Sequence, residues 1–587
     1  MTSLMSLPLL TTSYYSQKTK LPTCNTTSGM TRKRLATMSL EQTNGSNAST
    51  GGVENWQGGS PVSFDRRNVL LGFAGVYGAS QLGRNDHAMG APVETPLACH
   101  DAKVDGIGPV KCCPPYDWGH LGHWGEIVDF KFPSPSSPMR VRKPAHRLDH
   151  VNLLKYKEAI RLMKALPDDD PWSLTQQAKI HCAYCNGAYY QKGYNKIPLQ
   201  VHSNWLFLPF HRLYIYFFER ILGKLIGDET LAIPFWNYDA PIGMEMPSIF
   251  LDSSSSLYDE NRDDRHHPLR VLDYDYTIKG SKNCPPTESI SPKDTMTNNM
   301  CKMRYSVFRD DNLLIPELFM GAPVRGGESI ESHGSLEGLH NTVHNWTGLP
   351  ISFNFDMGNF FTAARDPMFF SHHANVDRLW EIYRKSRRYK TEFNDSDWLD
   401  SSFLFYDENK QLVRVKVRDS LKPSDLRYTY EDVEIPWRSS AITPKTCSMK
   451  SPVKKMASAI PFGSVPQALD TTLTNSVIMP DMLPGMSEED FVAVLIIHGI
   501  KVKDNKRARF DVYIGSPDGR AEDLVYAGSF SRLSHTHGET DVSLKLGITS
   551  LLRNFEVDTA ENIVVKVIPR EGDITIGGYS IELFKSD

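Results

Sequence analysis

Histidines that recur in a few short motifs constrain the fold of this chain more than any other feature, because distant segments must meet if the imidazoles bind one ion. His340 and His344 lie four residues apart, and positions i and i+4 of a helix share one face, so both imidazoles can reach the same ion. The adjacent pair His372 and His373 follows, and Asp377, one turn after His373, could orient a neighbouring imidazole. A single His-x-x-x-His pattern is weak evidence, since it occurs often by chance.

A second set of histidines lies upstream, at His181, His202 and His211. Nine residues separate His202 from His211, which would place them on opposite faces of one helix, so we expect His202 on the loop that leads in. Neither set has an acidic ligand nearby, which favours an imidazole-only metal pair. Imidazole-only coordination suits copper or zinc and disfavours magnesium, calcium or a carboxylate-bridged di-iron centre.

The rest of the chain divides into a helical part and a β part. At roughly 100 to 200 residues per domain, 587 residues predict more than one domain. Apolar residues recur at helical spacing over residues 146–166, 206–226 and 377–387. Short alternating runs, separated by turn signals, occupy residues 491–498, 509–514, 524–530, 562–568 and 580–584. We therefore predict a mainly α domain followed by a C-terminal antiparallel β-sandwich or barrel.

Composition sets the boundaries of these parts. Residues 91–145 are rich in Pro, Gly and Cys, and we expect an extended region held by disulfides. Residues 438–470 are short of aromatics and rich in Ser, Thr, Pro and Lys, as in a solvated linker. The predicted order is a leader (1–90), a mainly α domain (91–437), this linker and a β domain (471–587).

The leader has the composition of a targeting segment. Residues 1–40 contain no Asp or Glu, fifteen Ser or Thr and five Lys or Arg, which is typical of an organelle transit peptide, with a disordered tail as the alternative. Arg66-Arg67 then precedes an apolar stretch at 69–80 and a small-residue site at 88–91, the order of a twin-arginine export signal. Two signals in series predict the thylakoid lumen of a chloroplast and a mature N-terminus near Ala91 or Pro92.

Charge and hydropathy exclude several classes of function. No apolar run of 18 residues could span a bilayer, and the stretch at 69–80 is too short for a membrane anchor. A formal net charge of -4 offers no basic field for nucleic acid. The chain is 40% hydrophobic, too apolar for a disordered protein. Nine cysteines are too few for a disulfide scaffold of this length.

The motifs together resemble those of one family, the plant polyphenol oxidases of the tyrosinase and catechol oxidase group. The matching segments are His-Cys-Ala-Tyr-Cys (181–185), the segment from His202 to Arg212, His-Asn-Thr-Val-His (340–344), the segment 365–380, Asp-Trp-Leu (397–399), Tyr-Thr-Tyr (428–430) and Arg-Phe-Asp-Val-Tyr (509–513). With the double targeting signal, these motifs span nearly the whole chain. The resemblance implies a type 3 centre of two copper ions with O2 as co-substrate, held in a four-helix bundle.

The resemblance also implies the ligands and covalent links. The first copper would be bound by His181, His202 and His211, and the second by His340, His344 and His373. His373 is chosen because the family ligand precedes the Asp by four residues, which leaves His372 as a structural neighbour. The family's further links would be a thioether between Cys185 and His202 and the disulfides Cys99–Cys113 and Cys112–Cys182. The pairing of Cys284, Cys301 and Cys447 stays open.

Three further residues match functional positions of the family. Phe360 corresponds to a bulky gate over the copper pocket. Glu337 and Asn341 would hold a water that accepts the proton of a phenol. Glu337 stands three residues before His340, where the family's acidic residue usually stands four before. A solvated helix carboxylate is the alternative for Glu337.

The expected activity is O2-dependent oxidation of o-diphenols to o-quinones, with hydroxylation of monophenols, in a latent proenzyme covered by its β domain. The alternatives are an oxidase or hydroxylase specialised for one lignan, aurone or pigment precursor, a haemocyanin-like O2 carrier and, more distantly, a dizinc hydrolase. Expected partners are small phenols, O2 and the processing and export machinery, with no nucleic acid and no membrane anchor. The native phenol and the oligomeric state stay open.

Overall fold

The computed structural model describes residues 90–104, 106–115, 127–276, 291–351, 353–386, 393–439, 442, 460–480, 491–503, 506–517, 524–534, 542–553 and 562–585. All of these residues belong to one compact unit of the chain. The predicted leader up to residue 89, with Arg66-Arg67 and the stretch 69–80, lies outside the described residues, as do Cys284, Cys447 and most of the predicted linker.

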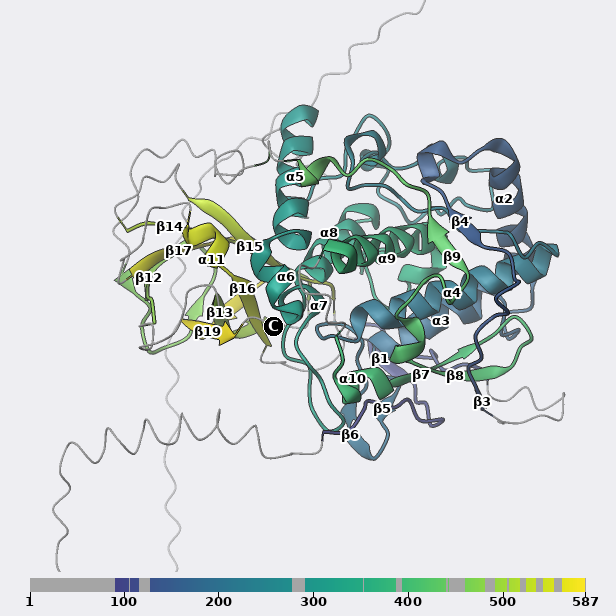
Figure 1. Cartoon of the computed structure of the whole chain (residues 1–587), viewed down its shortest axis with the longest axis horizontal. Coiled ribbons are helices and arrows are strands. Elements are labelled where there is room, and N and C mark those ends of the chain that lie inside the picture. The colour runs from purple at the N-terminus through teal and green to yellow at the C-terminus, as the bar shows by residue number, and fades with distance from the viewer. Residues whose placement is uncertain are drawn as a thin grey trace, which may run out of the picture. The chain divides into compact units, whose positions relative to one another are not determined.

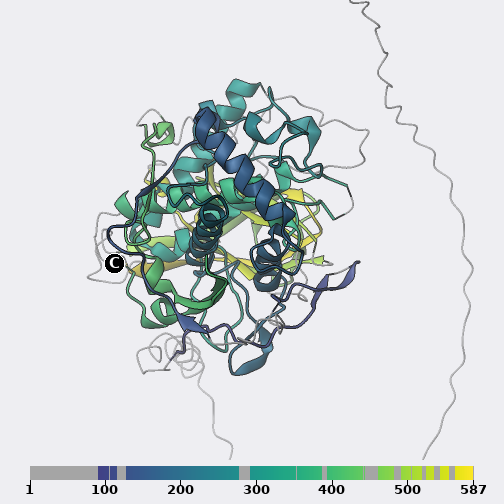
Figure 2. The ribbon, with the colours of Figure 1, turned by 90° about the vertical axis from the view of Figure 1, so that its right-hand side faces the viewer.

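The N-terminal part is mainly helical (Figure 1). Its α-helices are α2 (His150–Ala165), α3 (Leu174–Cys185), α4 (Phe207–Ile226), α5 (Pro292–Val307), α6 (Asp310–Leu314), α7 (Pro316–Met320), α8 (Ser335–Thr347), α9 (Met368–Ser386) and α10 (Ser396–Asp400). Short 3-10 helices lie at Ala145–Arg147, Pro241–Gly243, Ser248–Phe250, Asp264–His266, Ala363–Arg365, Val417–Ser420 and Pro436–Arg438. In Figure 2 the dark blue α2 lies across the face of this part that is nearest the viewer.

Local sequence explains where the main helices begin and end. The side chains of Asp149 and Ser173 accept backbone N–H groups at the first turns of α2 and α3. Helix α4 is apolar on nearly all sides and is buried accordingly. It ends at Gly227, whose φ of 65° is the left-handed conformation that favours glycine.

Helix α9 begins at Met368, well before the predicted start at residue 377. The predicted start of this helix is therefore too late. The first turns of α9 carry His372, His373 and Asn375, which are polar and yet buried, so they interrupt the apolar periodicity on which the prediction depended.

Short strands tie the N-terminal extended region to the helical part. β1 (Ala102–Val104) pairs with β2 (Gly108–Val110), and β5 (Tyr190–Gln191) pairs with β6 (Tyr194–Pro198). β3 (Val128–Asp129) joins β8 (Leu412–Lys416), which pairs with β7 (Ser402–Tyr406), and β4 (Arg140–Arg142) pairs in parallel with β9 (Tyr428–Tyr430). The pairings of β3 with β8 and of β4 with β9 join segments far apart in the sequence and hold the two ends of the helical part together.

Two five-stranded sheets form the C-terminal part, residues 460–585, which we call the β part. One sheet has the order β10 (Ile460–Pro461), β12 (Leu473–Ile478), β17 (Asn562–Glu571), β14 (Ala508–Gly515) and β15 (Val525–Arg532). The other has the order β11 (Gln467–Ala468), β18 (Ile574–Ile576), β13 (Phe491–Val502) and β16 (Val542–Gly547), with β19 (Gly578–Lys585) on β13, and the helix α11 (Thr549–Leu552) follows β16.

The two sheets share one hydrophobic core, to which β13 contributes Leu495 and Ile497 and β14 contributes Phe510 and Val512. β10 runs parallel to β12, so the sheets are not purely antiparallel as predicted. β10 and β11 also pair with strands of the β part, which therefore starts before the predicted boundary at residue 471. Among the described residues, no helix combines the length and the hydropathy that a membrane crossing needs.

Candidate metal centre

Three buried histidines form one cluster. α3 carries His181, α4 carries His211, and His202 lies in the segment that leads from β6 into α4, as the sequence spacing predicts. One ring nitrogen of each lies within 4.8 Å of the others. Each of the three residues is at most 2% exposed, so water does not compete for these nitrogens.

A second cluster joins α8 and α9. It contains His340, His344, His372 and His373. The Nε2 atom of His344 lies 2.9 Å from that of His340 and 3.3 Å from that of His373, and the His340 and His373 Nε2 atoms are 3.3 Å apart. Nitrogens that bind one ion tetrahedrally at about 2.0–2.1 Å lie about 3.3 Å apart. This triad therefore has the spacing of a three-imidazole site.

His372 differs from its neighbour. Both of its ring nitrogens are buried without a hydrogen-bond partner among the described residues, and neither is within hydrogen-bond distance of the other three Nε2 atoms. Its ring stacks on that of His340, with centroids 4.9 Å apart. The geometry favours His373 as the third ligand and leaves His372 as packing beside the site.

Backbone carbonyls orient several of the imidazoles. The Nδ1 atom of His181 lies 2.7 Å from the Phe360 carbonyl, and that of His211 lies 2.8 Å from the Phe207 carbonyl. The Nδ1 atom of His344 lies 2.7 Å from the carbonyl of Met357. A ring that donates its Nδ1 proton to a carbonyl presents an unprotonated Nε2 to an ion.

The two clusters face each other across the interior. The rings of His211 and His373 stack with centroids 4.2 Å apart, and those of His202 and His340 are 6.0 Å apart. Burial lowers the pKa of His181 to about 4 and that of His344 to about 3, so these imidazoles are neutral near pH 7. Two neutral, carboxylate-free imidazole sets fit a pair of copper ions, and the donor chemistry admits zinc as well.

A small cavity adjoins the first cluster. It has a volume of about 10 Å³, which is room for about one water molecule, and its lining includes His202, Glu337, Asn341 and Phe360. The ring of Phe360 lies 4.3 Å from that of His202, centroid to centroid. The structure thus brings together the three residues that were predicted from the resemblance to act on substrate.

The carboxyl of Glu337 is buried, with 1% of the residue exposed. Burial raises its pKa to about 8, against the opposing effect of the Ser203 N–H, which donates to both carboxyl oxygens at 2.8 and 3.1 Å. A solvated helix carboxylate, the alternative from sequence, is wrong. The irregular spacing before His340 still leaves Glu337 facing the cavity.

Asp377 holds α4 and α9 together. Its carboxylate pairs with Arg212, the residue after His211, and with Arg142 at 3.3 Å, and accepts the hydroxyls of Tyr428 at 2.7 Å and Tyr430 at 2.5 Å. Its hydrogen-bond partners in the described part of the chain are these four side chains. The expectation that Asp377 orients an imidazole directly is therefore wrong, because the arginines compete for both oxygens.

Four disulfide-bonded cysteines lie where the helical part meets its N-terminal extension, and Cys301 lies in α5. Disulfides join Cys99 to Cys113 and Cys112 to Cys182, and Cys301 is also disulfide-bonded. Cys185 is a free, buried thiol whose pKa is raised by burial and by the nearby Glu337 carboxyl. A bond between Cys182 and Cys112 fixes α3 one residue after His181.

The β part contacts the cavity directly. The Asn341 amide donates to the Ser531 carbonyl of β15 at 2.8 Å. Leu533, which is fully buried, lines the cavity and packs in the core of the helical part. Asn359 and Ser534 form an isolated β-bridge beside it.

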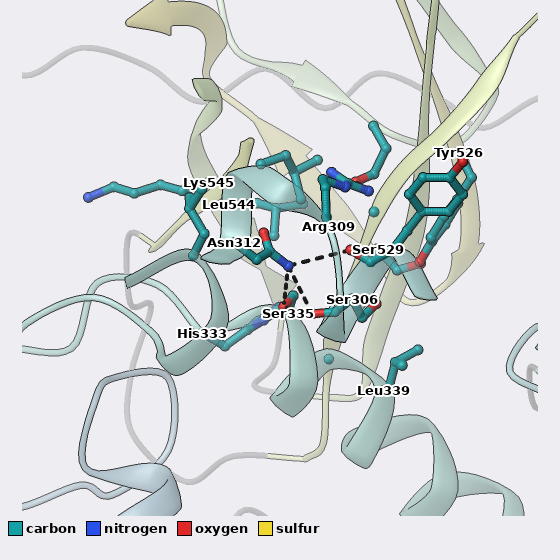
Figure 3. Close-up of a pocket in the computed structure, with 16 residues that line it drawn as sticks. Ser306, Arg309, Asn312, His333, Ser335, Leu339, Tyr526, Ser529, Leu544 and Lys545 are labelled. Atoms are coloured by element: carbon teal, nitrogen blue, oxygen red, sulfur yellow. Dashed lines mark hydrogen bonds between the residues drawn. The ribbon is translucent and has the colours of Figure 1, made fainter. Parts of the chain in front are cut away.

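Further contacts hold the β part in place around a cavity of about 20 Å³ between α5, α6, α8 and the strands β15 and β16 (Figure 3). Arg309 donates to the carbonyls of Gly547 at 2.7 Å and Ala527 at 2.8 Å. The N–H of Ser550 in α11 donates to the carboxylate of Asp311 at 3.3 Å. Arg309 thus binds the β part through its backbone, and Asp311 accepts both the N–H and the hydroxyl of Ser550.

The predicted motif Arg-Phe-Asp-Val-Tyr lies at the same interface. Arg509 donates to the Tyr276 carbonyl at 2.8 Å and lies 3.4 Å from Asp275. Lys302 pairs with Asp275 and lies 3.8 Å from Asp511. This motif therefore forms a buried charge cluster that spans the two parts of the chain.

Sequence reasoning missed Ser531, Leu533 and Arg309. Ser531 contributes a carbonyl, which any residue type provides, and Leu533 is one more apolar residue after a strand. No residue pattern could have identified either. Arg309 had a weak signal, as an arginine next to two aspartates between helices, but its partners are backbone carbonyls far along the chain.

Three family models match successive parts of the chain. Residues 171–386 match the common central domain of tyrosinase, residues 392–443 match the polyphenol oxidase middle domain, and residues 465–583 match the chloroplastic polyphenol oxidase C-terminal domain. The matched residues include both histidine clusters and most of the β part.

Known proteins are similar over nearly the whole chain. The chain is 45% identical over 556 residues to the chloroplastic polyphenol oxidase of Vitis vinifera, covering 90% of this chain and 88% of that protein. It is 41% identical over 553 residues to the chloroplastic (+)-larreatricin hydroxylase of Larrea tridentata, covering 89% and 91%. The solved structure of latent apple tyrosinase superposes with a TM-score of 0.71 at 42% identity, covering 78% of this chain and all of that one.

Proposed function

Because the chain belongs to the plant polyphenol oxidases of the type 3 copper family, and so is a copper-dependent oxidase, we propose that it oxidises o-diphenols to o-quinones with O2. The observation that carries this proposal is the meeting of two buried imidazole triads from four helices. We propose His181, His202 and His211 as ligands of one copper, and His340, His344 and His373 as ligands of the other. On this proposal α3, α4, α8 and α9 are the four-helix bundle around the pair.

When bound, the copper pair would activate O2 and accept the electrons that the diphenol loses. Two o-diphenols give up four electrons and four protons to one O2, and the products are two o-quinones and two waters. The side chains position the substrate for this exchange. Phe360, whose ring lies against His202, would hold the phenol ring above the first site.

Hydroxylation of monophenols needs a proton acceptor beside the phenol. We propose that Glu337 and Asn341 hold a water in the cavity that they share, and that this water accepts the phenolic proton. A carboxyl with a pKa of about 8 suits this role, because the best catalytic bases titrate near the working pH. Diphenol oxidation depends less on this acceptor, since catechols ionise more readily.

The thioether cross-link is a separate proposal. Cys185 would form a thioether with His202, which fixes the one proposed ligand that lies outside a helix. The reaction breaks the S–H bond of Cys185 and a ring C–H bond of His202 and forms one C–S bond. The two electrons and two protons that are lost would pass to O2, with the bound copper as catalyst. The intact mass of the purified protein tests the bond, since the linked form is lighter by two hydrogens and Cys185 no longer reacts with thiol reagents.

The β part, which we now call the shield, would make the enzyme latent. Leu533 lines the cavity, and the Ser531 carbonyl accepts a hydrogen bond from the Asn341 amide. While the shield is docked, a phenol can therefore use neither this space nor this amide. The apple relative's structure is described as latent, which supports the proposal. We propose the order leader, dicopper domain, linker and shield for the chain.

Location follows from the relatives and the leader. The relatives in Vitis and Larrea are named chloroplastic, so we assign this chain to the chloroplast. The twin-arginine order of the leader supports export into the thylakoid lumen. Import, export and processing machinery would then be its protein partners, and phenols and O2 its small-molecule partners.

A second candidate is an enzyme specialised for one metabolite. The Larrea relative is named as a hydroxylase of larreatricin, and its similarity to this chain is close to that of the general polyphenol oxidases. A lignan, aurone or pigment precursor would then be the native substrate, with the same dicopper chemistry.

O2 uptake tests the proposal. Copper-loaded protein, freed of its shield by limited proteolysis, should consume one O2 for every two molecules of 4-methylcatechol. Reversible O2 binding without catechol oxidation would instead indicate an O2 carrier. Tyramine turnover without a diphenol primer would establish monophenol hydroxylation, and a large preference for one lignan or chalcone over 4-methylcatechol would favour the specialised enzyme.

A further inference from the structure

His202 lies in a different kind of backbone from the other proposed ligands. The other five lie in α3, α4, α8 and α9, whose main-chain hydrogen bonds fix their positions. His202 belongs to the segment 199–206, which is neither helix nor strand and is buried apart from the half-buried Ser203. Buried N–H and C=O groups in such a segment need partners from elsewhere.

Gln200 supplies some of these partners. Its Oε1 atom accepts the N–H of Val201 at 2.9 Å and that of His202 at 3.0 Å. Its Nε2 atom donates to the Cys185 carbonyl at 3.0 Å, at the last residue of α3. One buried amide thus connects the backbone of His202 to the helix that carries His181.

Asn204, which is fully buried, supplies others. Its Nδ2 atom donates to the carbonyls of Gln200 at 2.9 Å and His202 at 2.8 Å. Its Oδ1 atom accepts the N–H of Leu206 at 2.8 Å, immediately before α4 begins. Asn204 thus connects the same backbone to the helix that carries His211.

The N–H of Ser203, the residue after His202, donates to the Glu337 carboxyl. Ser203 has a φ of 59°, a left-handed conformation that non-glycine residues adopt only when the surroundings impose it. Three side chains therefore satisfy the N–H groups of residues 201–203 and the carbonyls of residues 200 and 202. All of these contacts are to backbone groups of His202 and its immediate neighbours.

We propose that Gln200 and Asn204 are positioning residues for His202, and that they set its distance from His181 and His211 so that three imidazoles meet one ion. The inference rests on the proposed function, because it takes His202 as a copper ligand. Helical hydrogen bonds fix the second triad without such help. Loss of either amide should therefore weaken the first copper site and leave the second intact.

The test measures copper retention by the full-length, copper-loaded protein. Gln200→Leu and Asn204→Leu replace the amides by an apolar side chain that leaves no cavity, and they remove the hydrogen bonds. We expect one of the two copper ions to be lost to a competing chelator at about 10- to 100-fold lower chelator concentration than in the wild type, the usual effect of removing a group that orients a ligand. The second ion should stay at wild-type affinity.

Two variants separate positioning from general stability. Gln200→Glu keeps both acceptor contacts to the N–H groups of Val201 and His202 and loses only the donor contact to the Cys185 carbonyl, so it should retain the first copper ion better than Gln200→Leu does. Asn299→Leu removes an equally buried amide of α5 that accepts the Tyr274 N–H at 3.1 Å and donates to the Leu272 carbonyl at 2.6 Å. It should lower the melting temperature without changing copper affinity.

The inference is overturned if the two leucine variants retain copper as Asn299→Leu does, or if both ions leave together. A wild-type chain that binds fewer than two copper ions would contradict the proposed function and the inference with it. Copper per chain in the wild type therefore distinguishes the two failures.

Discussion

At the scale of single residues, the site depends on polar groups that are buried beside the histidines. Glu337 is the clearest case, because its carboxyl both faces the substrate cavity and accepts the Ser203 N–H next to His202. Family motifs predicted the residue despite its shifted spacing. They could not predict the contact with Ser203, since it depends on how two distant segments pack.

Glu337→Gln should separate the two activities of the shield-free enzyme. Glutamine keeps an oxygen that can accept the Ser203 N–H but cannot take a proton. We expect monophenol hydroxylation to fall by about 10²-fold or more, as for loss of a general base, and diphenol oxidation to fall much less. Steady-state kinetics with tyramine and 4-methylcatechol, at equal copper content, measure the split. Equal losses for both substrates would argue against the water-holding role.

At the scale of elements, the histidines meet because helices from distant segments are fixed in register. The charge cluster of Asp377, Arg142 and Arg212 joins α4, α9 and β4 below the histidine triads. Helical periodicity predicted α4 closely but missed the first turns of α9, where buried histidines replace apolar residues. Apolar periodicity indicates a helix face that packs against an apolar core. A helix face that packs around a metal centre carries polar residues, so it lacks this pattern.

Asp377→Asn should destabilise the whole domain. The variant removes the carboxylate that pairs with Arg212 and Arg142. Arg142 keeps its ion pair with Glu219 at 2.9 Å and Arg212 keeps its ion pair with Glu381 at 2.8 Å, so we expect a loss of about 3 kcal/mol, the lower end of the cost of breaking a buried ion pair. Urea unfolding of the shield-free protein measures the free energy. Asp400→Asn, whose ion pairs with Lys416 and Arg418 lie at the surface, is the control and should change stability by about 1 kcal/mol or less.

The ion pairs of Asp377 with Arg212 and Arg142 also make the stability of the protein depend on pH. Burial alone would raise the pKa of Asp377, but the charges of Arg212 and Arg142 and the two tyrosine hydroxyls lower it below its ordinary value of 3.8. The stabilisation is therefore complete above about pH 5 and is lost as the pH falls below 4 toward the lowered pKa. The difference in unfolding free energy between wild type and Asp377→Asn should shrink over that range. A difference that stays constant from pH 7 to pH 3 would contradict the assignment.

At the scale of the whole molecule, the shield is docked by contacts that the sequence does not display. Arg309 binds backbone carbonyls, and the Ser531 carbonyl binds Asn341. Five of the ten described strands of the shield, β13, β14, β15, β17 and β19, were predictable from alternating patterns and turn signals. Its docking face was not, because main-chain acceptors are the same for every residue type.

Leu533→Ala should relieve latency in the intact chain. Leu533 is one of several shield residues that line the cavity, and its side chain packs with the core of the helical part, so its truncation opens space beside the first histidine triad. We expect the full-length variant to oxidise 4-methylcatechol about tenfold faster than the wild type without protease, a change that corresponds to about 1.4 kcal/mol.

The matched control is Leu551→Ala, since Leu551 is equally buried in the shield but lies in its own core. If Leu551→Ala activates the chain as much as Leu533→Ala, latency reflects the stability of the shield and not the plug. Proteolytic removal of the shield should bring both variants to the wild-type rate.

Anomalous X-ray diffraction at the copper edge, from crystals of the copper-loaded protein, tests the dicopper centre most directly. We predict two copper peaks about 3.5–4 Å apart, the spacing of paired metal sites. One peak should lie among the imidazoles of His181, His202 and His211, and the other among those of His340, His344 and His373. A single peak, a peak bound by His372 in place of His373, or no copper at the two triads would contradict this account.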